Sequence, residues 1–189
     1  MNLPAKKYNI IYADPPWSYN ENWGNGAVKH HYSTMRLQDI VSLPVASIAD
    51  DNCHLYLWVT NPFIAEGLEV CKAWGFEYKQ LITWVKTYKT GEPIMGLGYY
   101  FRVCTEHCIF AVKGKLPRIN KSLKNLVTYP KRKHSEKPAE FREVIIAHSG
   151  DLPRIELFAR HDIDNWDVWG NQVGKLNEGN QQTLFEGVQ

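Results

Sequence analysis

A chain of 189 residues is long enough for one compact domain with a sizeable core and too short for two ordinary ones. Its apolar share of 44% and charged share of 22% lie near the averages of soluble globular proteins, which excludes wholesale disorder. The net charge of +2 is too small to identify a nucleic-acid binder. The chain shows neither a signal sequence nor an apolar stretch of the roughly 18 residues that span a bilayer, so we expect a soluble, cytoplasmic protein without a membrane partner.

The seven Trp and ten Tyr are more than core packing usually demands. Two interpretations stay open at this point. The aromatic side chains form a Trp-rich core, or some of them present flat faces on which unpaired bases stack.

The first predicted element is a strand at residues 8–13, a β-prone apolar run that Asp14 and two prolines stop. Residues 18–36 are polar and rich in Asn and Gly, and we expect them to form a loop beside the carboxyl end of this strand. Short helices are predicted at residues 37–42 and 45–48.

A second buried strand is predicted at residues 54–60, followed by a helix that Asn61 caps and Pro62 begins. Gly75 ends the helix. Its apolar positions recur at steps of three and four residues and are Ile64, Leu68, Cys71 and Trp74.

The rest of the chain is predicted to hold three more strands, one Gly-rich loop and one helix. The strands lie at residues 76–86, 103–113 and 154–158, the loop at 87–102 and the helix at 138–148. Residues 1–173 are expected to form the domain, and the polar residues 174–189 a disordered tail.

Strands that alternate with helices and long connections indicate an α/β fold, a doubly wound and mostly parallel sheet covered on both faces. Ligands in that architecture lie beyond the carboxyl ends of the strands. The polar residues that fall there are Asp14, Asn61, Lys86 and Arg160.

The four cysteines include a close pair in Cys-Thr-Glu-His-Cys at residues 104–108, which with His107 raises the question of a zinc site. The spacing is not the usual two-residue one and no second pair of ligands follows. The segment is predicted to be a buried strand in which cysteines pack as small hydrophobic residues, so we expect no metal.

A basic segment follows this strand. No acidic residue lies between Glu106 and Glu136. Such a segment either solvates a loop or follows phosphates. Its basic residues are Lys113, Lys115, Arg118, Lys121, Lys124, Lys131, Arg132 and Lys133.

The strongest motif is Asp14-Pro15-Pro16-Trp17. Asp-Pro-Pro followed by an aromatic residue should occur by chance in a chain of this length on the order of once in a few hundred sequences. An exocyclic amine on adenine is a poor nucleophile because its lone pair is delocalised into the ring. The Asp14 carboxylate and the Pro15 carbonyl, placed against its two hydrogens, favour a pyramidal nitrogen with the lone pair aimed at an electrophilic methyl group. Trp17 is expected to stack on a base that has left the duplex or is already single-stranded.

Several further motifs occur in one order along the chain. They are HYSTM at residues 31–35, LWVTNP at 57–62, WVKT at 84–87, EHCIFAVKG at 106–114, HSEKP at 134–138, IELFAR at 155–160 and WGNQ at 169–172. With the Asp-Pro-Pro-Trp motif, they resemble the MT-A-seventy family of N6-adenine amino-methyltransferases, and in particular its phage and bacterial DNA adenine methyltransferase branch. The resemblance implies a Rossmann-like class I methyltransferase fold in permuted order, with the catalytic motif N-terminal and the cofactor strand C-terminal. It implies S-adenosyl-L-methionine as the cofactor and nucleic acid as the partner, with DNA favoured over RNA.

The resemblance also implies roles for individual residues. Those expected to hold the cofactor are Asp14, Lys137, Phe158, Arg160, Asn171 and Gln172, with Lys137 on the carboxylate and Arg160, Asn171 and Gln172 on the ribose. Those expected near the target base or its strand are Tyr32, Asn61, Lys86, Lys131, Arg132 and Lys133. Each has an ordinary alternative, such as a solvated lysine at a helix start or a polar turn.

Two departures from the family pattern concern the cofactor. Only 13 residues precede Asp14, so the upstream segment that often contacts the cofactor's adenine is nearly absent. Where many methyltransferases have a glycine-rich turn after the cofactor strand, this chain has Ala159-Arg160-His161-Asp162. We therefore expect side chains rather than backbone amides to hold the ribose.

Two other functions stay open, an RNA N6-adenosine methyltransferase with the same chemistry and a catalytically inactive nucleic-acid-binding partner subunit. The sequence also leaves open whether the protein forms a homo- or hetero-oligomer. The tail adds a separate hypothesis. Gln181-Gln182-Thr183-Leu184-Phe185 resembles the short peptide with which bacterial proteins dock on the replication sliding clamp.

Overall fold

One sheet organises the part of the chain that the computed structural model describes, residues 2–18, 34–132 and 135–171. In these residues seven strands pair in the order β5-β3-β4-β2-β1-β6-β7. They are β1 (Tyr8–Ala13), β2 (Ala49–Val59), β3 (Glu77–Thr87), β4 (Thr105–Lys113), β5 (Leu126–Pro130), β6 (Arg154–Leu157) and β7 (Asp167–Trp169). Only β4, among these strands, runs antiparallel to its neighbours, so the expected mostly parallel sheet is confirmed.

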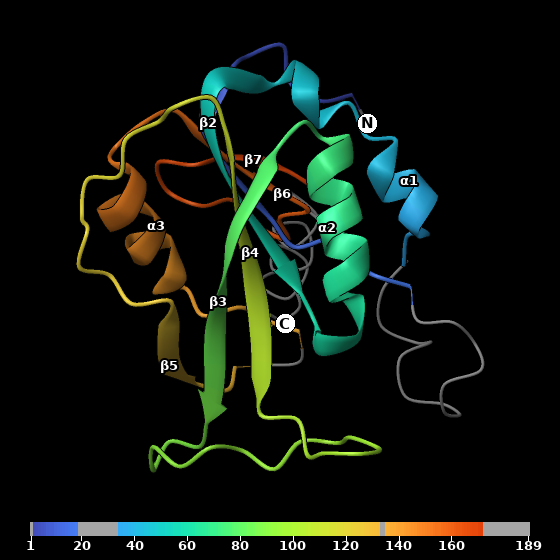
Figure 1. Cartoon of the computed structure of the whole chain (residues 1–189), viewed down its shortest axis with the longest axis vertical. Coiled ribbons are helices and arrows are strands. Elements are labelled where there is room, and N and C mark those ends of the chain that lie inside the picture. Colours follow the sequence, from blue (N-terminus) through green and yellow to red (C-terminus); the bar gives the residue numbers. More distant parts are fainter. Residues whose placement is uncertain (1, 19–33, 133–134, 172–189) are drawn as a thin grey trace, which may run out of the picture.

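Helices cover both faces of the sheet, as a doubly wound fold requires. Figure 1 shows α1 and α2 on one side and α3 on the other. The helices are α1 (Leu37–Val41), α2 (Ile64–Ala73) and α3 (Phe141–Ser149), and two short 3-10 turns are η1 (Val45–Ser47) and η2 (Asn61–Phe63). Of the described helices, none is long and apolar enough to cross a membrane.

The central strand β1 is buried on both faces because it lies between two parallel neighbours, β2 and β6. Its side chains alternate between two cores. Ile11 and Ala13 pack with residues of α1 and α2, whereas Ile10 and Tyr12 pack with residues of α3. This alternation leaves the strand no solvated face, and the polar Asp14 follows directly after its last residue.

All strands except β4 end at one edge of the sheet, since they are parallel to one another. Asp14, Asn61, Lys86 and Arg160 therefore share this edge, as the sequence predicts. The β3–β4 loop, residues 88–104, projects from the same edge beyond the ends of β3 and β4 (Figure 1).

Some local predictions are wrong. Asn61 does not cap α2, because a 3-10 turn comes first and Phe63 is the N-cap residue. Leu68 is exposed, and the buried face of α2 instead includes Gly67, which lies directly against Val59 and Ile109. Close packing of the helix on the sheet thus depends on a residue without a side chain.

The strands β5 and β7 were not expected from the sequence. β5 lies inside the basic segment, at the edge of the sheet, and its side chains are alternately exposed and partly buried. β7 has three residues and forms the other edge. The predicted tail lies outside the described residues.

Candidate active site

The Asp14-Pro15-Pro16-Trp17 loop leaves β1 at the centre of the sheet and is fixed by its own backbone. The Pro15 carbonyl accepts a hydrogen bond from the Trp17 amide at 2.9 Å, and the Pro16 carbonyl accepts one from the Met35 amide at 2.8 Å. A carbonyl oxygen has two lone pairs, so Pro15 keeps one acceptor position. Neither proline brings an amide donor that would compete for the Asp14 carboxylate.

Trp17 anchors this loop. Its indole is only 8% exposed, donates from Nε1 to the Trp58 carbonyl at 3.0 Å, and stacks on Phe63 with ring centroids 5.5 Å apart. Most of the ring is therefore in the core, and what remains accessible lines the cleft described below. The expected stacking of Trp17 on a base stays a prediction.

Four charged side chains form a chain of ion pairs beside the loop, and we call them the charge network: Lys86, Glu106, Lys137 and Asp14. The Lys137 ammonium lies 2.8 Å from Asp14 Oδ1 and 3.4 Å from Glu106 Oε2. Glu106 also pairs with Lys86. All four side chains are at most a quarter exposed, so water screens these charges weakly.

Burial and neighbouring charges shift the pKa values in this network in different directions. Burial raises the pKa of Asp14 above its ordinary value, and the Lys137 ammonium offsets only part of that effect. Burial also disfavours ionisation of Glu106, but Lys137 and Lys86 outweigh it and lower the pKa of Glu106. Burial alone would lower the pKa of Lys137, whereas Asp14 and Glu106 raise it. Lys137 is therefore held as a cation between two carboxylates.

An open cleft of about 120 Å³ lies over the Asp14 end of this network. Its lining residues are Asp14, Pro15, Pro16, Trp17, Thr34, Trp58, Val59, Thr60, Glu106, Ser135, Lys137 and Arg160. Glu106 Oε2 is buried there without a hydrogen bond of good geometry. A buried acceptor left in this way is a place for a donor from a ligand.

Aromatic side chains support the charge network from below. The Lys137 ammonium lies 5.5 Å from the centre of the Trp58 ring, a distance at which the ring face attracts a cation. Trp58 in turn donates from Nε1 to the Tyr12 hydroxyl at 2.7 Å. A second ion pair joins Arg142 Nε to Glu156 Oε2 at 2.7 Å. The Arg142 guanidinium lies 5.8 Å from the centre of the Tyr12 ring.

Asp14 and Lys137 line the cleft, and of the other described residues expected to hold the cofactor, Phe158, Arg160 and Asn171, only Arg160 does so. Phe158 follows β6 with a φ of 65°, a left-handed conformation that is rare for a bulky residue, and its ring packs edge-on against Trp169. Arg160 lines the cleft, and Asn171 lies just beyond the end of β7. Gln172 is outside the described residues.

Of the residues expected near the substrate, none that the structure describes lines the cleft. Lys86 belongs to the charge network. The Asn61 side chain is bound to β4, because it donates to the Thr105 carbonyl at 3.2 Å and accepts from His107 at 3.0 Å. Arg132 pairs with Glu140, and Lys131 is exposed after β5. Tyr32 and Lys133 lie outside the described residues.

Glu106 is the site residue that sequence reasoning missed. It appears in the EHCIFAVKG motif, but no spacing along the chain connects it to Lys86 or Lys137. The β3–β4 pairing places Glu106 opposite Trp84, beside Lys86 at the end of β3. Its neighbour His107 is held by Asn61 and by Thr83, the latter at 3.1 Å. Cys108 is buried in the core, as predicted, whereas Cys104 precedes β4 and is only partly buried.

Residues 8–172 match the sequence profile of the MT-A70 family. The chain is 34% identical to the Type II methyltransferase M.MunI of a Mycoplasma species, over 90% of this chain and 80% of that protein. It is 31% identical to the N(6)-adenosine-methyltransferase catalytic subunit METTL3 of Homo sapiens, and 31% identical to an N(6)-adenosine-methyltransferase MT-A70-like protein of Drosophila melanogaster. These two matches cover 90% and 88% of this chain but only 29% and 27% of the relatives. Because the family match begins at β1 and includes the whole charge network, the chain belongs to the MT-A70 family of N6-adenine methyltransferases.

Proposed function

We propose that this protein transfers a methyl group from S-adenosyl-L-methionine to the N6 amine of adenine in DNA. The observation that carries the proposal is the Asp14 carboxylate, held 2.8 Å from Lys137 in a cleft at the carboxyl edge of the sheet. The cleft offers both an acceptor for an amine and a cation for a carboxylate. The acceptor would bind the amine of adenine and the cation would bind the carboxylate of the cofactor, so that both reactants meet in one cleft.

Asp14 and Pro15 would position the amine. The ionised carboxylate accepts one amino hydrogen and the free lone pair of the Pro15 carbonyl accepts the other, which directs the nitrogen lone pair away from the ring. Burial raises the pKa of Asp14, and the Lys137 ammonium opposes part of that effect and so favours the carboxylate form. Because the reaction is a displacement at carbon with no covalent enzyme intermediate, positioning accounts for most of the catalysis.

The donor set of the cleft fits the cofactor. An amino-acid end carries an ammonium and a carboxylate close together, and the Asp14–Lys137 pair offers the matching charges. Arg160, Asn171 and Gln172 would hold the ribose, and Phe158 would line the pocket. When bound, S-adenosyl-L-methionine supplies the electrophilic methyl group.

Two considerations favour DNA over RNA. The motifs resemble those of the phage and bacterial branch, whose compact members act on DNA. The similarity to the bacterial M.MunI extends over 80% of that protein, whereas the chain spans only about a quarter of the eukaryotic N(6)-adenosine-methyltransferases. Lys131, Arg132 and Lys133 would contact phosphates, and Tyr32 and Asn61 would lie beside the bound strand.

The experiment is to incubate the protein with S-adenosyl-L-methionine and matched single- and double-stranded DNA and RNA, and to quantify methylated nucleosides by mass spectrometry after digestion. N6-methyldeoxyadenosine is expected with the wild type and not with Asp14→Ala. N6-methyladenosine in RNA alone would favour the RNA alternative. No methylated adenine on any polymer, despite cofactor binding, would favour an inactive nucleic-acid-binding subunit.

A further inference from the structure

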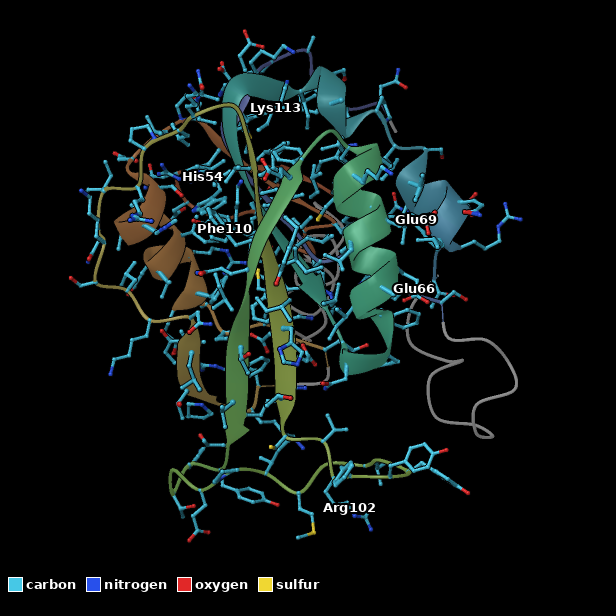
Figure 2. All side chains as sticks on the ribbon, viewed as in Figure 1. His54, Glu66, Glu69, Arg102, Phe110 and Lys113 are labelled. Carbon is cyan, nitrogen blue, oxygen red and sulfur yellow. The ribbon has the colours of Figure 1, made fainter. Side chains whose placement is uncertain are left out.

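Among the large apolar side chains of the described residues, the most exposed ones lie in the β3–β4 loop. Met95 is 74% exposed, and Leu97, Tyr99, Tyr100 and Phe101 are between 83% and 90% exposed. Exposed apolar side chains gathered on one short segment mark an interaction surface more often than chance. Figure 2 shows Arg102 on this loop, beyond the ends of β3 and β4 and at the opposite end of the molecule from Lys113. We call residues 95–102 the tip.

Hydrogen bonds and an ion pair join the two ends of the β3–β4 loop to the charge network. The strands on either side of the loop carry Lys86 near the end of β3 and Glu106 near the start of β4, and these two residues pair in the charge network. The Lys86 amide donates to the Cys104 carbonyl at 2.8 Å, and the Lys86 carbonyl accepts from the Ile94 amide at 2.9 Å. These bonds set where the tip starts relative to the cleft.

The tip turns sharply, so its side chains must point outward. A Cβ atom at Gly98 would overlap the carbonyl oxygen of Phe101, which means that the two backbones touch. A turn this tight has no interior in which Tyr99 or Tyr100 could be buried. Their rings contact each other edge to face at 4.9 Å and are otherwise directed to solvent.

We propose that the tip enters duplex DNA beside the target adenine and that its aromatic side chains fill the space that the adenine leaves in the base stack. The inference rests on the proposed function, because an adenine has to leave the base stack only if the protein methylates it within duplex DNA. The amine must reach Asp14, whose side chain is only a quarter exposed, so the base must be extruded. Apolar side chains inserted between base steps offset the lost stacking.

The charges beside the tip favour nucleic acid over a second copy of this chain. Lys89 and Arg102 lie in the loop, and Lys131 follows β5, the strand paired with β3. A symmetric contact between two tips would bring like charges together, whereas phosphates neutralise them. The loop residues themselves include one acidic side chain, Glu92.

The test first maps an adenine that the wild type methylates in duplex DNA. Two oligonucleotide duplexes then present that adenine either paired with thymine or opposite an abasic site, where it is already unpaired. The variant is Y99S/Y100S/F101S, and the matched control is Y78S, which removes a partly exposed aromatic residue of β3 outside the loop. Circular dichroism checks that each variant is folded.

We expect the triple variant to lose about tenfold or more in kcat/KM on the paired adenine and less than about threefold on the adenine opposite the abasic site. The control should match the wild type on both duplexes. Equal losses on both duplexes would overturn the proposal, and so would a change from dimer to monomer by sedimentation, which would make the tip a contact between copies. A wild type that methylates adenine only in unpaired polymers would also overturn it while leaving N6-methylation standing. A wild type without methylation on any polymer would instead reject the proposed function.

Discussion

Lys137 and Asp14 are 123 positions apart in the chain, and their side chains meet at 2.8 Å over the carboxyl end of β1. The contact joins the loop before α3 to the strand at the centre of the sheet. Each partner is at most a quarter exposed, and each favours the charged form of the other. The candidate site therefore forms only when the two halves of the fold are assembled.

Lys137→Met tests this dependence. Removing the cation leaves Asp14 buried with less compensation, so its pKa should rise further and the acid limb of the pH–kcat/KM profile should move to higher pH. Cofactor affinity should fall about 10- to 100-fold, the typical effect of losing a hydrogen bond to a charged group. Calorimetry and pH-dependent kinetics measure the two effects. Lys79→Met, at an exposed lysine paired with Glu77, is the control and should change neither.

Substitutions of Trp17 distinguish two roles of its side chain, anchoring the loop and stacking on a base. Trp17→Phe keeps a ring on Phe63 but loses the bond to the Trp58 carbonyl, and we expect about 1 kcal/mol less stability in denaturant unfolding. Trp17→Leu also removes the aromatic face, and kcat/KM should fall about tenfold further if a base stacks there. Equal kcat/KM values for the two variants would show that Trp17 only anchors the loop.

The order of the main helices and strands could be predicted because each apolar run ends at a residue that stops a helix or a strand. The strand before Asp14, the helix before Gly75 and the helix before Gly150 lie where the sequence places them, within a few residues. The strands β5 and β7 could not, since their burial comes from the neighbouring strand rather than from their own pattern. Short edge strands carry little periodic signal.

The site was predicted in part for a similar reason. Asp14 belongs to a motif whose chemistry is contained in adjacent residues, and Lys137 was expected only through the family resemblance. Glu106 acquires its role from the pairing of β3 with β4, which sets it beside Lys86. No local pattern encodes that contact.

Gly170→Ala should loosen the cofactor side of the cleft. A Cβ atom at Gly170 would overlap the Ala159 carbonyl oxygen, so the segments that carry Arg160 and Asn171 must move apart. We expect a stability loss of about 2 kcal/mol and a cofactor affinity reduced about fivefold or more. Ile145→Val in the core of α3 is the control, because it lowers stability by about 1 kcal/mol and should leave cofactor affinity unchanged.

The Gln181–Phe185 peptide lies outside the described residues, and clamp docking stays a prediction. A tail peptide should bind a bacterial sliding clamp at micromolar concentration, with Leu184 and Phe185 as apolar anchors. Calorimetry with the wild-type peptide and with L184A/F185A measures this. Absence of binding by the wild-type peptide would reject the hypothesis without bearing on methylation.

His54 makes the stability of the fold depend on pH at a place away from the cleft. It is buried, its Nε2 donates to the Leu116 carbonyl at 3.1 Å, and its Nδ1 accepts from Ser149 at 2.8 Å. Burial, and then the neighbouring His148, lowers the pKa of His54 from 6.5 to about 4. The unfolded chain thus takes up a proton below pH 6.5 that the folded protein refuses until about pH 4.

Stability should therefore be constant with respect to His54 above pH 6.5 and fall as the pH drops from 6.5 to 4, by up to about 3 kcal/mol for a shift of this size. His148, whose pKa is also lowered, adds to the same trend, whereas buried Asp14 and Glu156, whose pKa values are raised, oppose it. Comparison with His54→Gln isolates the histidine, since the other groups are common to both proteins. Urea unfolding at pH 7.5, 6.0 and 5.0 should show the wild type losing stability faster than the variant as the pH falls. Parallel pH profiles would mean that His54 is protonated in the folded protein as readily as in the unfolded chain.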